Sequence, residues 1–204
     1  MLPARLQLAL IALAACAAAA VVGVLLAASR QAGAQPGLDL SDGWAGALRP
    51  PGLMVPGFRL HDQDGRVVTS QSLRGKPVVY AFVYSTCRDT CPAEVQTIRG
   101  ALDDLGRDVP VMGVSVDPRN DTPRNAIAFL LAQKMTGRMT FLLGARAELA
   151  PVWRAFGIQP QANGLEHSAH VVLADAQGRQ RIGFPFEQLT EQRLAHDLAR
   201  LSKR

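Results

Sequence analysis

Residues 77–92 read Pro77-Val78-Val79-Tyr80-Ala81-Phe82-Val83-Tyr84-Ser85-Thr86-Cys87-Arg88-Asp89-Thr90-Cys91-Pro92. The first half is short, β-branched and aromatic, which predicts a strand buried on both faces. Proline is favoured in the first turn of a helix and Thr90 can cap one, so we expect a helix to begin near Cys91. The pattern therefore predicts a buried strand, a loop with two cysteines and a helix, in that order.

Strands and helices alternate on both sides of this unit. A hairpin is expected upstream, at residues 58–68, because Asp62-Gln63-Asp64-Gly65 forms a turn signal between two short strand patterns. Downstream we expect strands at 109–116, 139–143, 169–174 and 179–184, and helices ending near 105 and spanning 121–134, 146–156 and 187–202. This order predicts an α/β, thioredoxin-like domain with a central mixed sheet flanked by helices.

The N-terminus carries a long apolar segment. Residues 6–28 are almost continuously apolar, and 23 helical residues span roughly 34 Å, enough to cross a hydrocarbon core of about 30 Å. The apolar part of a secretory signal has only about 7–15 residues, so a retained transmembrane helix is favoured. Cleavage of this segment is the alternative, in one of two ways. Leu13-Ala14-Ala15-Cys16 resembles a lipobox, at which Cys16 would be lipidated, and Ala32-Gly33-Ala34 resembles a signal-peptide cleavage site.

These segments suggest three regions. Residues 1–30 form a predicted anchor that crosses the inner membrane once, and residues 31–56 form a linker rich in glycine, alanine and proline. Residues 57–204 form the thioredoxin-like domain, which we expect outside the cytoplasm, in the periplasm of a Gram-negative cell. The net charge of +5 is scattered and aromatic residues are few, so nucleic-acid binding is disfavoured.

Cys87 and Cys91 lie where α/β domains place functional groups, between a strand and a helix. The positive end of the helix dipole and the neighbouring Arg88 favour thiolate over thiol. The two sulfurs can chelate a soft metal ion, close a redox-active disulfide or form a structural one. Two sulfurs suit Cu(I), and an added imidazole also suits Cu(II). Disulfide oxidoreductases of this fold have two residues between their cysteines, whereas three lie between these.

A third metal ligand would come from one of four histidines. His61, in the first hairpin, and His196, on the last helix, are expected at ordinary surface positions. His167 and His170 precede a strand that we expect to face the cysteine loop. Their separation of three residues places them on opposite faces of an extended chain, and the pattern leaves the choice between them open.

Three segments together resemble the Sco/SenC family. They are the cysteine loop at 84–92, Val114-Ser115-Val116-Asp117-Pro118-Arg119-Asn120-Asp121-Thr122-Pro123, and Glu166-His167-Ser168. They occur in the order typical of that family, and the resemblance extends from about Phe58 to the C-terminus. The apolar N-terminal segment is also typical of the family.

The resemblance implies a copper chaperone that assists assembly of the dinuclear copper site of cytochrome c oxidase. It assigns Cys87, Cys91 and His167 as the ligands of one copper ion. It also matches Asp117 and Asp121 to acidic positions near the site, although the residues alone favour structural roles, with Asp121 as a helix cap. The implied partners are the copper-site subunit of the oxidase, or another copper or thiol client, and a membrane.

Two other functions stay open. Family members are also associated with keeping the cysteines of the oxidase site reduced, so a thiol–disulfide oxidoreductase with Cys87 and Cys91 as its redox pair is the alternative. No proline stands just ahead of Ala169, where such enzymes present one, and the sequence favours a binding protein over an enzyme. An interaction module stapled by the cysteines is the third possibility. Glu166, where aspartate is expected, and Arg88-Asp89-Thr90, where a proline is common, depart from the family and leave the client open.

Overall fold

The computed structural model describes Pro3, Cys16 and residues 43–159 and 170–203, and all contacts given below are among these residues. The chain divides into two units, Met1–Asp42 and Gly43–Arg204, and the helices and strands below belong to the second unit. Among the described helices, none has the length and apolar character needed to cross a membrane. Apart from Cys16, the predicted anchor at 6–28 lies outside the described residues and stays a prediction.

A six-stranded sheet with the order β1-β8-β7-β4-β5-β6 forms the centre of the second unit. Its strands are β1 (Ala47–Leu48), β4 (Val78–Val83), β5 (Val111–Ser115), β6 (Met139–Leu142), β7 (His170–Ala174) and β8 (Gln180–Pro185). β4, β5 and β6 are parallel to one another, whereas β7 is antiparallel to β4 and to β8, and β1 is antiparallel to β8. The predicted mixed sheet of a thioredoxin-like domain is confirmed.

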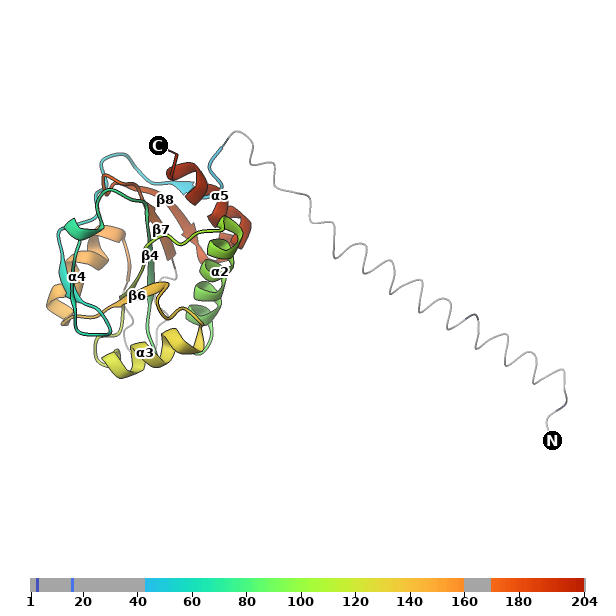
Figure 1. The fold of residues 1–204 in the computed structure, drawn as a ribbon, viewed down its shortest axis with the longest axis horizontal. Coiled ribbons are helices and arrows are strands. Elements are labelled where there is room, and N and C mark those ends of the chain that lie inside the picture. Colours follow the sequence, from blue (N-terminus) through green and yellow to red (C-terminus); the bar gives the residue numbers. More distant parts are fainter. Residues whose placement is uncertain (1–2, 4–15, 17–42, 160–169, 204) are drawn as a thin grey trace. The chain divides into compact units, whose positions relative to one another are not determined.

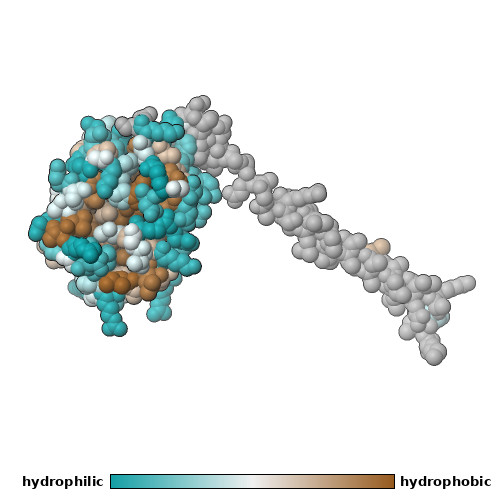
Figure 2. Space-filling model, viewed as in Figure 1, coloured by the Kyte–Doolittle hydropathy of each residue, from teal (hydrophilic) through white to brown (hydrophobic). Residues whose placement is uncertain are grey.

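Helices cover both faces of this sheet. Figure 1 shows α2 (Thr90–Leu105) and α5 (Glu191–Leu201) together on one side and α4 (Arg146–Phe156) on the other. The remaining helix, α3 (Pro123–Ala132), follows β5 and packs Phe129 against Phe141 of β6, with ring centroids 5.9 Å apart. Ile127 and Leu131 are exposed on the outer face of α3, and Figure 2 shows hydrophobic surface in this part of the molecule.

The pattern of β4 explains why helices pack on both faces. All six of its residues are buried. Tyr80 and Phe82 contact Phe156 of α4, each with ring centroids 5.0 Å apart. Because successive side chains of a strand point to opposite faces, Val79 and Ala81 face the side that α2 and α5 cover. A central strand must be apolar on both faces when both are covered, as the sequence of β4 predicts.

The predicted hairpin is present as a separate two-stranded sheet of β2 (Arg59–His61) and β3 (Val67–Thr69). Gly65 lies in its turn with a φ of 81°, a conformation that favours glycine. The backbones of His61 and Leu143 exchange two hydrogen bonds of 3.0 and 2.7 Å, which join the hairpin to the chain that follows β6. The hairpin thus covers the β6 edge of the main sheet.

One predicted helix cap and one predicted helix start are wrong. α2 begins at Thr90, so Asp89 and not Thr90 occupies its N-cap, without a side-chain hydrogen bond to the helix. The last helix begins at Glu191 and not at 187, because Thr190 caps it by accepting a hydrogen bond from the N–H of Arg193. A short 3-10 turn, Phe186–Gln188, occupies the predicted first turn.

Part of the predicted linker packs on the domain. β1 pairs with β8 at the edge of the sheet, and Ala45 and Val55 are buried. The N–H groups of Ala45 and Gly46 each donate a 2.9 Å hydrogen bond to the carboxylate of Asp197 on α5, which is fully buried. The Gly- and Pro-rich composition of this segment does not reveal the contact, because its partner lies about 150 residues away in sequence.

Candidate metal centre

Cys87 and Cys91 lie together where β4 passes into α2. The N–H of Cys87 donates to the carbonyl of Tyr84 at 3.2 Å, which turns the chain immediately after the strand. Cys91, in the first turn of α2, is buried, whereas Cys87 is partly exposed. The N–H of Cys91 donates a hydrogen bond to Sγ of Cys87 at 3.3 Å. No disulfide joins Cys87 and Cys91 in this structure.

The two thiols differ in acidity. Burial is the largest influence on Cys87 and opposes its ionisation, but hydrogen bonds from the backbone of Asp89 and from the side chain and backbone of Cys91 outweigh it. The pKa of Cys87 therefore lies below its ordinary value. Burial raises the pKa of Cys91, and the neighbouring Cys87 thiol raises it further. Cys87 is thus the thiol that ionises first and that solvent, metal or a partner protein can reach.

Glu94 is a buried acid that the sequence reasoning missed. It follows Cys91 by three residues on α2, is fully buried, and neither carboxylate oxygen has a hydrogen-bond partner among the described residues. Burial first, and then the charge of Cys87, raises the pKa of Glu94 to about 8. Its spacing of three from Cys91 places both on one face of the helix, and this spacing was the available signal.

Asp121 fastens the start of the cysteine loop to the end of β5. Its Oδ1 accepts hydrogen bonds from the N–H and the hydroxyl of Ser85, each at 2.6 Å, and its Oδ2 accepts one from the Ser115 hydroxyl at 2.5 Å. The carbonyl of Ser115 in turn accepts a 2.8 Å hydrogen bond from the indole of Trp153 on α4. Asp121 therefore holds a residue two positions before Cys87 against the rigid sheet.

The helix-cap interpretation of Asp121 is wrong. The N-cap of α3 is Thr122, whose hydroxyl oxygen accepts a 3.2 Å hydrogen bond from the N–H of Asn125. Asp117 does have a structural role, because its Oδ2 accepts a 2.7 Å hydrogen bond from the side-chain amide of Asn120 within the turn that follows β5. Asp117 thus stabilises its own turn, whereas Asp121 holds the cysteine loop.

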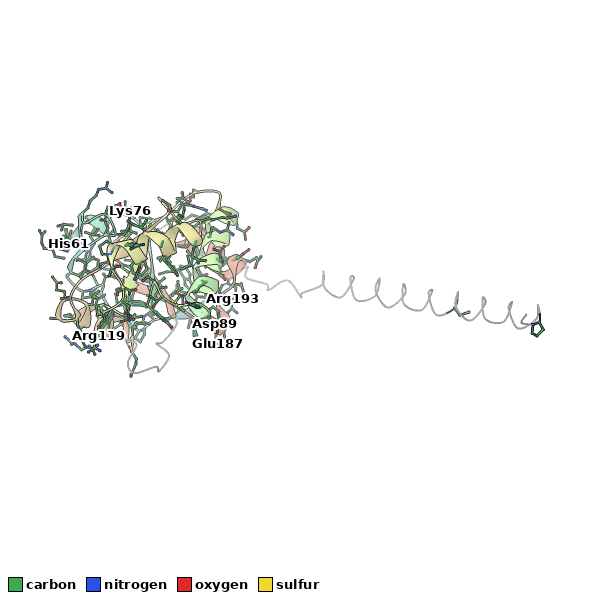
Figure 3. The ribbon with its side chains drawn as sticks, turned by 90° about the horizontal axis from the view of Figure 1, so that it is seen from below. His61, Lys76, Asp89, Arg119, Glu187 and Arg193 are labelled. Atoms are coloured by element: carbon green, nitrogen blue, oxygen red, sulfur yellow. The ribbon has the colours of Figure 1, made fainter. Side chains whose placement is uncertain are left out.

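The cysteine loop shares its edge of the sheet with other loops. β4 and β5 end at this edge because they are parallel, and β8 ends there because His170, at the start of β7, pairs with Pro185. Figure 3 labels charged residues from the three connections: Asp89 beside the cysteines, Arg119 after β5 and Glu187 after β8. A partner that contacts the partly exposed Cys87 would meet this charged rim.

His167 lies outside the described residues, so its place relative to the cysteines stays a prediction. Among the described residues, no group of three or more cysteine, histidine, aspartate or glutamate side chains is arranged to hold a metal ion. The described part of the chain therefore brings together two sulfurs, those of Cys87 and Cys91, and in the predicted copper site a third ligand would come from residues outside it.

The other three histidines have local contacts. His61 is exposed on β2. The Nε2 of His196 lies 3.1 Å from the carbonyl oxygen of Gly43. His170 begins β7 and lies over Gly183, where an added Cβ would come within 2.7 Å of its Nε2. Burial lowers the pKa of His170, which keeps the imidazole neutral near pH 7.

Comparisons with known proteins match this domain to one family. The family model described as SCO1/SenC matches residues 47–203. Protein SCO1 homolog 1, mitochondrial, of Arabidopsis thaliana is 29% identical over 119 residues, which cover 56% of this chain and 35% of that protein. Protein SenC of Rhodobacter capsulatus is 36% identical over 85 residues, 39% of this chain and 38% of that protein. The chain thus spans little more than a third of the length of these two relatives.

Solved structures agree with these matches. ScoI of Bradyrhizobium japonicum, solved with copper bound, superposes with a TM-score of 0.63 at 32% identity, covering 72% of this chain and 99% of that one. BsSco, a member of the Sco family of cytochrome c oxidase assembly proteins with a disulfide switch, superposes with a TM-score of 0.66 at 22% identity. The match covers 75% of this chain and 95% of that one, and at this identity it supports the fold alone. The family match encloses the cysteine loop and most of the chain, and the chain belongs to the SCO1/SenC family.

Proposed function

We propose that this protein binds one copper ion through Cys87, Cys91 and His167 and passes it to the dinuclear copper site of cytochrome c oxidase. The observation that carries the proposal is the pair of neighbouring thiols at the N-terminus of α2, in which Sγ of Cys87 accepts a hydrogen bond from the N–H of Cys91 at 3.3 Å. The copper-bound relative at 32% identity supports the choice of metal. Copper is the cargo in this proposal, which requires a site that both takes up and releases the ion.

The chemistry of the donors fits copper. Thiolates are soft ligands that prefer Cu(I), and an imidazole added to them also accommodates Cu(II). Cys87 ionises most readily and would bind first, and binding at Cys91 then requires loss of the proton that burial retains there. The segment with His167 leads directly into β7, the antiparallel neighbour of β4, so the chain enters β7 at the edge where the cysteine loop lies.

We also propose that residues 6–28 tether the domain to the membrane as a single-pass helix, with the domain outside the cytoplasm. In this arrangement the client is the copper-site subunit of the oxidase, or another extracytoplasmic protein that takes copper or exchanges thiols. Because residues from Gly43 onward pack on the sheet, the domain that moves on the tether includes the second half of the predicted linker.

An anaerobic copper titration tests the ligand set. We expect the reduced domain to bind one Cu(I) per chain and His167→Ala to weaken Cu(II) binding more than Cu(I) binding, because the imidazole matters most for the oxidised ion. Exposed His61 provides the matched control, and His61→Ala should leave the affinities for Cu(I) and for Cu(II) unchanged. The proposal fails if a Cys87→Ser, Cys91→Ser double variant binds as much copper as the wild-type domain.

The unequal acidity of the two thiols favours a second function, thiol–disulfide exchange. A partly exposed thiol with a lowered pKa beside a buried one is suited to attack a disulfide, after which the buried thiol resolves the mixed disulfide and releases the reduced client. Rapid reduction of a model disulfide that persists with a copper chelator and in His167→Ala would establish this activity. Exchange no faster than that of a Cys87→Ser variant would exclude it.

A further inference from the structure

A hollow of about 560 Å³ lies between the lead-in segment and the start of β8. It is lined by Leu48, residues 50–52 and Gln180, and by three arginines, Arg49, Arg179 and Arg181. β8 begins beside Ala174, which pairs with Val78 at the start of β4, whereas the cysteine loop follows the end of β4. The hollow is therefore at the opposite end of the sheet from the cysteines, about 20 Å away along a strand of six residues.

The charge of this hollow is strongly positive. Arg181 forms one ion pair, with Asp175 at 3.3 Å, and Arg49 donates to the carbonyl of Phe156 at 3.0 Å. Arg179 is exposed and forms no ion pair with any described residue. Asp175 is the one described carboxylate that pairs with these arginines, and the Arg49 guanidinium is directed to the Phe156 carbonyl, so Arg179 supplies a positive charge without a counterion. Guanidinium groups bind phosphate through paired hydrogen bonds, and a phosphate group balances this excess better than a single carboxylate.

Apolar side chains lie exposed beside the arginines. Leu48 lines the hollow and is 65% exposed, and Met54, whose backbone bridges to Arg179, is 42% exposed. Exposed apolar side chains next to arginines are typical of surfaces that rest on the membrane interface, where the cation meets lipid phosphates and the apolar group enters the boundary with the acyl chains. A soluble phosphate compound would make no use of Leu48 or Met54.

If the predicted anchor spans the membrane, few residues separate this surface from it. Between the predicted anchor, which ends at Ala28, and Gly43 there are 14 residues, which can reach at most about 50 Å. The hollow begins at Leu48, only a few residues further along. We propose that the hollow binds the phosphate group of an anionic phospholipid and holds the domain on the membrane with the cysteine loop directed away from the bilayer. This inference goes beyond the proposed copper function and rests on the predicted tether.

Vesicle binding tests the proposal. Gly43–Arg204 forms one compact unit with its own core, so it can be used without the anchor. We expect it to sediment with vesicles of equimolar phosphatidylcholine and phosphatidylglycerol and not with vesicles of phosphatidylcholine alone. An Arg179→Ala, Arg181→Ala double variant should bind on the order of thirtyfold more weakly, given the contribution of each arginine near an anionic surface.

A second double variant that removes the same charge elsewhere tests whether vesicle binding depends on the hollow or only on the net charge of the domain. Arg119→Ala with Arg124→Ala removes the same charge from exposed positions after β5 and on α3, far from the hollow. It should change vesicle affinity less than about twofold at ordinary salt, where charges more than roughly 10 Å away are screened. Equal losses in the two double variants would overturn the proposal. If loss of the Arg181–Asp175 pair prevents folding, Arg179→Ala alone should still weaken binding about fivefold.

Free glycerol phosphate distinguishes the source of the phosphate. The proposal expects it to compete only weakly with the mixed vesicles, because it lacks the acyl chains that Leu48 and Met54 would contact. Saturable binding of glycerol phosphate together with equal sedimentation on both vesicle types would overturn the assignment to a lipid. Copper titration of the Arg179→Ala, Arg181→Ala variant should match the wild-type domain, so failure of the vesicle experiment and failure of the copper proposal are separate results.

Discussion

Glu94 brings a carboxyl group into the core one helical turn beyond the cysteine pair. Burial, and then the charge of Cys87, raises its pKa from 4.5 to about 8. Between these two values the folded chain holds a proton that the unfolded chain releases, so the free energy of unfolding falls as the pH rises. The stabilisation is complete below about pH 4.5 and is lost by about pH 8, a total on the order of 5 kcal/mol.

Glu94→Gln should remove most of this dependence, because the amide has nearly the same size and does not ionise. We expect the variant to match the wild-type domain near pH 5 and to be more stable by a few kcal/mol near pH 8. Urea unfolding of the reduced domain across this range measures the difference. Glu187→Gln, at an exposed position, is the matched control. Parallel pH profiles for wild type and Glu94→Gln would show that the carboxyl does not titrate in this range.

At the scale of the elements, the site depends on how a loop is held between a strand and a helix. The N-terminus of α2 supplies the N–H group that contacts Cys87, and β4 supplies a rigid base for the loop. Asp121 joins the cysteine loop to β5, because its carboxylate accepts hydrogen bonds from Ser85 at the start of the loop and from Ser115 at the end of the strand. The sheet and α2 would retain their core without Asp121, but the loop would lose its attachment.

Asp121→Asn tests this attachment. The amide replaces one acceptor oxygen by a donor facing a hydroxyl or N–H group, so we expect a loss of about 1–3 kcal/mol in the free energy of unfolding. We also expect the pKa of Cys87 to rise toward its ordinary value, because the hydrogen bonds that lower it depend on the loop. Chemical unfolding measures the first effect and thiolate absorbance against pH measures the second.

Asp117→Asn provides the comparison for this variant. Asp117 contacts Asn120 within an exposed turn, so its substitution should change stability by about 0.5 kcal/mol or less. If Asp121→Asn lowers stability but leaves the thiolate titration where it is in the wild-type domain, Asp121 supports the fold and has no influence on the cysteines.

At the scale of the whole molecule, the first residues of the domain and its last helix depend on each other. The buried carboxylate of Asp197 on α5 accepts hydrogen bonds from the N–H groups of Ala45 and Gly46, and Arg193 contacts the carbonyl of Ala45. β1 adds an outer strand beside β8. Removal of this segment would leave a charge in the interior without these partners, which is costly.

A chain that begins at residue 57, the boundary expected from composition, should therefore be less stable than one that begins at Gly43. We expect the free energy of unfolding to fall by about 3–5 kcal/mol, the usual cost of removing one partner of a buried charge. Chemical unfolding of the two lengths measures it. Adding Asp197→Asn to the shorter chain should recover part of the loss, because the unpartnered charge is gone. Equal stability of the two lengths would show that the domain begins after the lead-in.

Much of the fold follows from patterns that are local in sequence. The apolar run of β4, the hairpin turn at Gly65 and the left-handed Gly157 after α4 identify their elements, because strand burial and glycine conformation depend on neighbouring residues. The N-cap of α2 and the start of the last helix were misplaced, since several residues near each start can cap a helix and the folded backbone geometry selects among them.

The cysteine pair could likewise be found from sequence, because both thiols lie in one short segment between a strand and a helix. The roles of Glu94, Asp121 and Asp197 could not, because each depends on partners or burial created when distant segments meet. A carboxylate has the same sequence signature in water as in the core, and only folding sets its solvation and its hydrogen bonds. The amino-acid sequence was therefore sufficient for the class of fold and for the place of the two cysteines, whereas packing of the sheet and helices determined the surroundings of these acids and brought the lead-in segment onto the sheet.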